Sequence, residues 1–259
     1  MSALRSLLAL PELRDWKYDL NAPETTVLHG EIIRRKPFLR KLYVEWYTAM
    51  KKKAKGVPAG LSVEIGSGAG FIKEIIPNVI TTDVLALPTV DRVLSAERLP
   101  FDDKSVSTIF GVDVFHHIPN VESFLREADR CLVRGGRIIL HEPANSWWGR
   151  FIYQNFHHEP FEPNGGWTFA TDGPLSVANG ALPWIVFERD KKIFAEKFPS
   201  FHVVSIEHHT PVRYLLSGGV SMRALTPGWS FVFWKIVELM LSPLSPMFSM
   251  FQTIVVEKR

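Results

Sequence analysis

Hydrophobic positions recur along this chain with two different spacings. Before residue 60 they recur every three or four residues, at Leu39, Leu42, Tyr43, Trp46, Tyr47 and Met50. This spacing predicts a long amphipathic helix that packs on the main domain. From residue 61 short apolar runs alternate with helical stretches, and the predicted strands are Leu61–Ile65, Val79–Asp83, Arg92–Leu94, Val106–Val112 and Arg137–Glu142. The alternation predicts a parallel sheet with helices on both faces.

A second helical stripe runs from Val121 to Leu132, with Pro119-Asn120 at its start and Arg134-Gly135-Gly136 at its end. After Pro143 the alternation stops in a segment rich in Trp, Phe, His, Pro and Gly. Strand-like alternation returns at Phe201–Glu207 and Phe251–Glu257. The long interruption predicts an insert that lies against the site, because large loops commonly carry specificity.

Composition narrows the class of protein. The 259 residues are 46% hydrophobic and 22% charged, as expected for a soluble globular chain. The net charge of +3 and the lack of a long basic stripe argue against a nucleic-acid partner, and Lys51–Lys55 is interpreted as a solvated helix end. Cys131 is the only cysteine, which excludes an intrachain disulfide and predicts a core residue. Residues 1–10 do not resemble a secretory signal, so we expect a cytoplasmic protein.

The late segment Trp229–Phe251 is strongly apolar but is interrupted by Lys235, Glu238, Pro243 and Pro246. A membrane-spanning helix needs roughly 20 uninterrupted apolar residues, so we do not expect one here. We interpret the segment as a cover for the core or for a substrate cleft. Peripheral membrane contact through its aromatic residues is the alternative.

The segment from Val63 to Gly70 joins a short strand to three glycines at alternate positions. These glycines permit a tight turn and close approach of the backbone to a ligand, and residues 71–76 then show helical spacing. The dinucleotide fingerprint would place its third glycine one position later, which disfavours a dinucleotide or nucleotide-sugar enzyme. Glu64 suits a cationic or hydroxyl-rich ligand rather than a phosphate. An ordinary glycine-rich turn stays the alternative for the glycines alone.

Three acids, Glu64, Asp83 and Asp113, end successive predicted strands. A ligand of an open parallel sheet lies beyond the carboxyl ends of its strands, so these acids should face one cleft. The carboxylate of Asp83 suits two vicinal ribose hydroxyls, which indicates a nucleoside. A helix N-cap is the alternative role for Asp83.

Five segments together resemble a class I S-adenosyl-L-methionine-dependent methyltransferase: Val63–Gly70, Asp83, Ala96–Phe101, Val112–Pro119 and Leu132–Ile138. The resemblance covers about residues 60–143 and is most similar to the branch that methylates quinones, sterols and natural products. It implies an α/β fold with a Rossmann-like, seven-stranded, mostly parallel sheet and helices on both faces. An N-terminal helix and an aromatic-rich insert or lid would complete a single domain over 1–259. We divide it into a helical cap (1–60), a cofactor-binding core (61–143), a substrate-side insert (144–200) and C-terminal strands with a hydrophobic insertion (201–259).

The resemblance also implies the residues that bind the cofactor. The glycine loop would face its methionine part, Asp83 its ribose and Val84 its adenine. Ser95 stands where the family usually has Asp, so a hydroxyl, Glu97 or water would take over the contact with the adenine amino group. The complete predicted set is Glu64, Gly66, Ser67, Gly68, Gly70, Asp83, Val84, Ser95, Ala96, Glu97, Asp113 and Val114.

Methyl transfer by in-line displacement depends mainly on alignment of the reactants, and we expect no metal. A hydroxyl or acidic carbon acceptor needs a base, for which we predict His117, His157 or His158. The pair His116 and His117 has a second interpretation as a wall of the cofactor pocket, and His141 as packing. Metal binding by residues 157–159 is disfavoured because adjacent histidines of an extended chain point to opposite faces.

We therefore expect an S-adenosylmethionine-dependent methyltransferase that acts on a small or lipid-like acceptor. Aromatic residues of the insert supply surface for such an acceptor, namely Trp147, Trp148, Tyr153, Phe156, Phe161, Trp167 and Phe169. The alternative is a catalytically silent cofactor-binding partner or regulatory subunit, since no base is unambiguous. Methylation of protein or nucleic acid is disfavoured because no Asn/Asp-Pro-Pro-Tyr-type motif follows the fourth strand.

Overall fold

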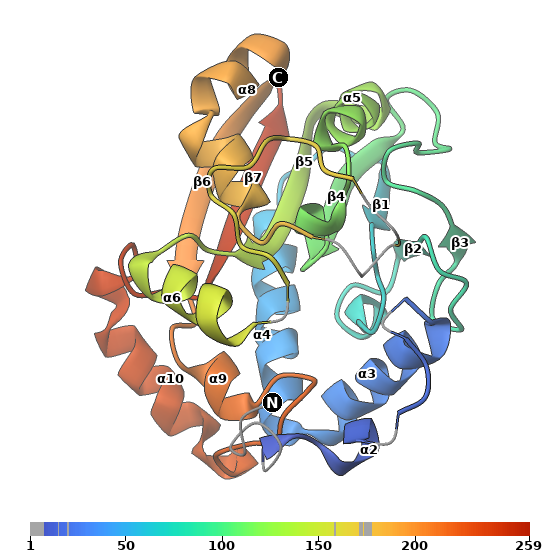
Figure 1. Cartoon of the computed structure of the whole chain (residues 1–259). Coiled ribbons are helices and arrows are strands. Elements are labelled where there is room, and N and C mark those ends of the chain that lie inside the picture. Colours follow the sequence, from blue (N-terminus) through green and yellow to red (C-terminus); the bar gives the residue numbers. More distant parts are fainter. Residues whose placement is uncertain (1–7, 15, 20, 158, 171–172, 174–177) are drawn as a thin grey trace.

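A single seven-stranded sheet forms the centre of the computed structural model, which describes residues 8–14, 16–19, 21–157, 159–170, 173 and 178–259 (Figure 1). The strand order is β3-β2-β1-β4-β5-β7-β6. The strands are β1 (Leu61–Glu64), β2 (Val79–Asp83), β3 (Arg92–Val93), β4 (Val106–Val112), β5 (Leu132–Pro143), β6 (Phe201–His209) and β7 (Phe251–Lys258). Strands β1 to β5 are parallel, whereas β7 runs antiparallel to both β5 and β6. The predicted Rossmann-like, mostly parallel sheet is confirmed.

Helices cover both faces of this sheet because its central strands alternate buried side chains between two cores. On one face α4 (Pro37–Lys53) packs its apolar stripe against Phe110, Ile139 and Val255. This contact confirms the predicted N-terminal helix, and α2 (Pro11–Arg14) and α3 (Pro23–Arg35) precede it. The opposite face is covered by α5 (Val121–Cys131), α7 (Leu182–Trp184), η3 (Ile185–Arg189) and α8 (Lys191–Lys197).

Helix α5 begins as predicted and ends earlier. The Asn120 side chain accepts a hydrogen bond from the Ser123 amide at 3.1 Å, which caps the helix. The helix stops at Cys131, which is fully buried as expected, and Leu132 pairs at once with Val106 of β4. The predicted end at residues 134–136 was wrong, because burial of Leu132 in the sheet replaces another helical turn.

The helix expected at residues 71–76 does not form. Its place holds a single 3₁₀ turn, η1 (Ile72–Glu74). Pro77 follows directly and disfavours helical geometry in the residue before it. Helix α4 already covers this face of the sheet, and Phe71 and Ile72 are buried against it. A helical spacing over six residues was too short a signal to outweigh these constraints.

The insert and the C-terminal insertion contribute α6 (Trp147–Phe156), α9 (Arg213–Ser217), η4 (Gly228–Ser230), α10 (Phe231–Met240) and η5 (Ser242–Leu244). Segments distant in sequence meet here, since the Trp148 amide donates to the Met247 carbonyl at 3.2 Å. The division of the chain into four parts stays a prediction.

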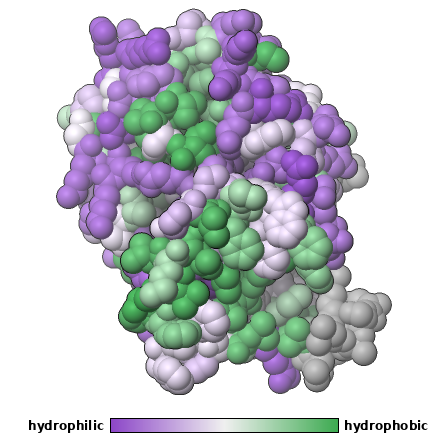
Figure 2. Space-filling view, turned by 90° about the vertical axis from the view of Figure 1, so that its left-hand side faces the viewer, coloured by the Kyte–Doolittle hydropathy of each residue, from purple (hydrophilic) through white to green (hydrophobic). Residues whose placement is uncertain are grey.

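The expectation that residues 229–251 cover the core holds for only one face of α10. Phe231 and Trp234 pack inward, whereas outward side chains of α10 are exposed, such as Met240 at 74%, and Trp229 of η4 is 82% exposed. Hydrophobic surface accordingly gathers in the lower half of the molecule in Figure 2. Among the described residues, no helix has both the length and the apolar character needed to cross a bilayer.

Candidate functional site

A cavity of about 1670 Å³ opens beyond the carboxyl ends of β1, β2, β4 and β5. All twelve residues predicted to bind the cofactor line it, as do His117 and His157. His158 lies outside the described residues. Ligand sites commonly measure roughly 300–1,000 Å³, so this cavity has room for two reactants side by side. The structure thus brings the predicted residues together, while their binding roles stay predictions.

Two glycines of the loop after β1 are required by protein packing. A Cβ added at Gly66 would lie 2.1 Å from Val114 Cγ2, and the residue has a φ of +56°. A Cβ at Gly70 would lie 2.3 Å from the Tyr47 hydroxyl oxygen. Neighbouring residues leave no space for a side chain at either position. The two glycines are therefore needed for packing within the protein, in addition to the close ligand approach expected from the sequence.

Asp83, at the end of β2, holds the same loop. Its carboxylate accepts hydrogen bonds from the Gly68 and Leu85 amides, both at 2.9 Å. Burial raises the pKa of this carboxyl, although the backbone donors oppose that effect. No helix follows β2 before β3, so the alternative role of Asp83 as a helix N-cap was wrong.

Two further acids each present a buried oxygen without a hydrogen-bond partner among the described residues. These atoms are Glu64 Oε2 and Asp113 Oδ1. Burial raises the pKa of Glu64 to about 8, although hydrogen bonds from Ser67 and Tyr47 oppose it. Burial also raises the pKa of Asp113 to about 8, and that residue has a strained φ of +51°. Such unsatisfied acids favour a ligand that carries positive charge.

Val84 and Ser95, which we predicted to lie near the adenine, line the cavity after β2 and β3. The Ser95 hydroxyl oxygen accepts a hydrogen bond from the Glu97 amide at 3.2 Å, so it orders the turn that follows β3. Its hydrogen is still available to a ligand. Val84 lines the cavity with an exposed side chain.

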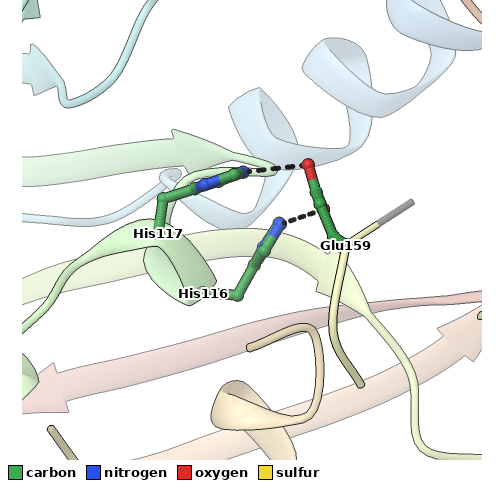
Figure 3. A group of neighbouring side chains, drawn as sticks. All are labelled: His116, His117 and Glu159. Atoms are coloured by element: carbon green, nitrogen blue, oxygen red, sulfur yellow. Dashed lines mark ion pairs between the residues drawn. The ribbon is translucent and has the colours of Figure 1, made fainter. Parts of the chain in front are cut away.

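The turn η2 (Phe115–His117) carries His116 and His117 (Figure 3). Both histidines line the cavity. His116 Nδ1 lies 2.6 Å from Glu142 Oε2. The other carboxylate oxygen of Glu142 accepts hydrogen bonds from the Val114 and Phe115 amides at 3.0 and 2.7 Å. Glu142 therefore fixes both the turn and the imidazole ring.

Glu159 reaches this turn from the segment after α6. Its carboxylate oxygens lie 3.3 Å from His116 Nε2 and 3.5 Å from His117 Nε2. His157 Nδ1 is 3.6 Å from the same carboxylate. The segment is anchored by the Gly180 amide, which donates to the Pro160 carbonyl at 2.9 Å. We call His116, His117 and Glu159 the His-Glu cluster.

Charges in the His-Glu cluster stabilise one another. Burial opposes the charged form of His116, but Glu142 and Glu159 outweigh it and raise the pKa of the ring. Burial likewise opposes ionisation of Glu159, but His116 and His117 hold the pKa of its carboxyl well below the usual range. The cluster thus combines a cationic ring with ionised carboxylates inside a largely buried wall.

His141 has the packing role that the sequence suggested. It is fully buried and stacks on Trp46 with ring centroids 4.1 Å apart. Burial and neighbouring His209 lower its pKa well below the usual range, so the ring is neutral. His141 does not line the cavity.

Sequence reasoning missed that Tyr43, Tyr47 and Tyr214 line the cavity, whereas it had proposed Tyr153 among the aromatic residues that contact the acceptor. The first two belong to the apolar stripe of α4, where periodicity shows that a face is buried and not what it faces. It also missed that Glu159 meets the histidines of η2. No local signal relates these segments, because their contact depends on how the insert folds back over the sheet.

Comparison with known proteins places residues 63–140 in a family whose model is described as a methyltransferase domain. No curated protein matches the chain. Similar solved structures include YcgJ from Bacillus subtilis, at 16% identity over 83% of this chain and 98% of that chain, with a TM-score of 0.48. Another is a possible histamine N-methyltransferase from Thermotoga maritima, at 16% identity over 88% and 99% and a TM-score of 0.48.

A third is geranyl diphosphate C-methyltransferase from Streptomyces coelicolor A3(2), at 14% identity, with 97% of this chain and 91% of that chain covered and a TM-score of 0.44. These similarities are too distant to bear on the acceptor.

Proposed function

We propose that this chain, whose residues 63–140 match a methyltransferase domain, is a class I S-adenosylmethionine-dependent methyltransferase that transfers a methyl group to an apolar, lipid-like acceptor. The observation that carries this proposal is the large cavity, whose two ends differ in chemistry. One end holds the acids and the glycine loop, and the other is lined by aromatic and aliphatic side chains.

The polar end suits the cofactor. Bound S-adenosylmethionine supplies an electrophilic methyl group on a positively charged sulfur. The unpaired oxygens of Glu64 and Asp113 favour a cationic ligand in this part of the cavity, and Asp83 has lone pairs left for vicinal hydroxyls. Gly66 and Gly68, both with positive φ, give the loop between these acids its tight turn.

The apolar end suits a lipid-like acceptor. Its lining residues come from α6, the segment after α6, α9 and the start of β7, and they include Ile152, Tyr153, Phe156, Phe161, Tyr214, Leu215, Met250 and Phe251. Of these eight described side chains, only Tyr153 and Tyr214 carry a polar group that could orient a sugar or a nucleotide. Burial of an apolar acceptor against this wall would contribute roughly 25 cal/mol per Å² of apolar surface.

The apolar wall continues onto the outer surface. Phe156 lines the cavity and is also 60% exposed, and its ring lies 5.9 Å from that of Phe151. Phe151 stacks with Trp147, and neighbouring Trp148 bonds to the segment after α10. The exposed face of α10 belongs to the same side of the molecule (Figure 2). This continuity supports an acceptor delivered from an apolar phase, with peripheral membrane contact.

The His-Glu cluster lies where the nucleophilic group of the acceptor would meet the methyl group. Both histidines, Glu159 and the cofactor-side residue Asp113 line one cavity. In-line displacement requires the two reactants to be held in contact, and rigid η2, fixed by Glu142, provides that support. The catalytic roles of His117 and His157 remain proposals.

Transfer of labelled methyl groups tests this function directly. We expect the purified protein, given methyl-labelled S-adenosylmethionine and a lipid extract, to move label into the organic phase and to release S-adenosylhomocysteine. Asp83→Ala should abolish the transfer, while Asp102→Ala, on an exposed residue outside the cavity, should preserve it. Label that stays in water-soluble products would contradict a lipid-like acceptor. A protein that binds cofactor without turnover would favour the silent-subunit alternative.

Cofactor binding should depend on pH through Glu64. Its pKa is raised to about 8 in the free protein, and a cationic ligand beside it favours the carboxylate. Below about pH 8 binding therefore releases protons, and affinity should rise as pH increases from about 6 to about 8. Calorimetry in two buffers of different ionisation enthalpy measures this release. Equal heats in both buffers at pH 7 would refute it, and Glu64→Gln should reduce the release.

A further inference from the structure

The three side chains of the His-Glu cluster converge with their ligand atoms within 4.8 Å of one another. Sequence reasoning expected no metal because in-line methyl transfer requires none, and its argument that adjacent histidines of an extended chain diverge concerned residues 157–159 only. His116 and His117 instead belong to the 3₁₀ turn η2, which brings their ring centroids to 4.3 Å. In Figure 3 both rings point toward the carboxylate of Glu159. Two imidazoles and one carboxylate thus face a shared point.

The spacing of these atoms fits coordination. The Glu159 oxygens lie 3.3 and 3.5 Å from the two Nε2 atoms, longer than the roughly 2.7–2.9 Å of charge-assisted hydrogen bonds. Ligands about 2.0–2.1 Å from a tetrahedral Zn²⁺ ion are separated by roughly 3.3–3.4 Å. The cluster therefore needs little rearrangement to hold such an ion.

Glu142 lies behind the cluster and orients one of its two imidazole rings. A metal-binding histidine commonly donates its second ring N–H to a carboxylate, which fixes the tautomer and the direction of the ring. His116 has this arrangement, since Nδ1 lies 2.6 Å from Glu142 Oε2. Glu142 is itself fully buried and fixed by the Val114 and Phe115 amides. His116 Nε2 is consequently held toward Glu159.

We propose that His116, His117 and Glu159 bind one divalent transition-metal ion of the Zn²⁺ type, with a further coordination position open to the cavity. Two imidazoles and a carboxylate suit Zn²⁺ and its neighbours rather than Mg²⁺ or Ca²⁺, which prefer oxygen ligands. Three protein ligands with an open position are typical of catalytic rather than structural zinc sites.

The open position would take an oxygen ligand from the cavity, either water or a hydroxyl group. Binding of the ion would release the Nε2 proton of His116 to solvent. Coordination lowers the pKa of the oxygen ligand, and its proton would also leave to solvent because both Nε2 atoms then serve as ligands. That the hydroxyl belongs to the methyl acceptor rests on the function proposed above. Binding of the ion itself does not depend on that function.

Metal titration without cofactor or acceptor tests the site, so its result is separate from any failure of methyl transfer. The chelator-treated full chain is titrated with ZnCl₂ in a calorimeter, and CoCl₂ is added to a second sample. We expect one ion per chain and the intense visible absorption of four- or five-coordinate Co²⁺. Glu159→Gln and His117→Ala should weaken binding at least about 100-fold, and Glu142→Gln about 10- to 100-fold.

His202→Ala is the matched control, because this histidine lies on β6 beside Glu257 and outside the cavity. Its affinity should equal that of the unchanged protein. Circular dichroism verifies that each variant is folded. The absence of saturable binding by the folded chain would overturn the proposal, as would binding unchanged in Glu159→Gln or a weak, six-coordinate Co²⁺ spectrum.

Discussion

Asp83→Ala is expected to weaken S-adenosylmethionine binding by about 100-fold or more. Hydrogen bonds to a charged group contribute roughly 1.5–3 kcal/mol each, so loss of two ribose contacts corresponds to roughly 10²–10⁴ in affinity at 1.4 kcal/mol per factor of ten. The substitution also removes the hydrogen bonds that the Gly68 and Leu85 amides donate to the Asp83 carboxylate, both at 2.9 Å. Isothermal titration calorimetry with S-adenosylmethionine and S-adenosylhomocysteine measures the change.

Two variants separate a binding role of Asp83 from a structural one. Asp83→Asn keeps the volume of the side chain but loses the charge, and should lose a large part of the affinity while the protein remains folded. Asp102→Ala removes an exposed acid outside the cavity and should bind cofactor as the unchanged protein does. If Asp83→Ala retained affinity within about threefold, the assignment of the ribose site would be wrong.

Glu238→Ala is expected to lower the free energy of unfolding by about 3–5 kcal/mol, the usual cost of removing one partner of a buried ion pair. Glu238 forms an ion pair with the Arg213 guanidinium. Its carboxylate also accepts hydrogen bonds from the Val212 and Arg213 amides at 2.9 and 2.7 Å. Both side chains are about 5% exposed. Glu45, 2.8 Å from the guanidinium, would compensate only part of the remaining charge. Urea denaturation measures the loss.

The matched control is Glu207→Ala, which removes a partner of Lys53 from an ion pair whose carboxylate is 59% exposed. Exposed pairs contribute about 0–1 kcal/mol, so this variant should unfold near the midpoint of the unchanged protein. If both variants lost a similar free energy of unfolding, burial of the Arg213–Glu238 ion pair would not increase its contribution to stability. Because Tyr214 and Leu215 of α9 line the apolar end of the cavity and the ion pair holds α9 to α10, Glu238→Ala should also impair acceptor binding.

The sequence was most informative where the chemistry is contained in one short segment. The strands β2 and β4 have their predicted bounds, and Glu64, Asp83 and Asp113 end strands that the apolar runs identified. Strand direction alone then brings these acids to one edge of a parallel sheet. The helix predicted for residues 71–76 was wrong for the opposite reason. Packing against α4 and a following proline outweighed a weak local preference for helix.

By itself the sequence indicated the parallel sheet, the glycine loop and the acids at the polar end of the cavity, because strand-length apolar runs alternate with helical stretches and each acid ends or directly follows such a run. Only the tertiary structure decided that Glu159 joins His116 and His117, that Glu142 supports them, and that α6 and α10 expose their apolar side chains. The physical reason is that these contacts join segments with no common periodicity. Their positions depend on how the insert and the C-terminal helices pack over the sheet.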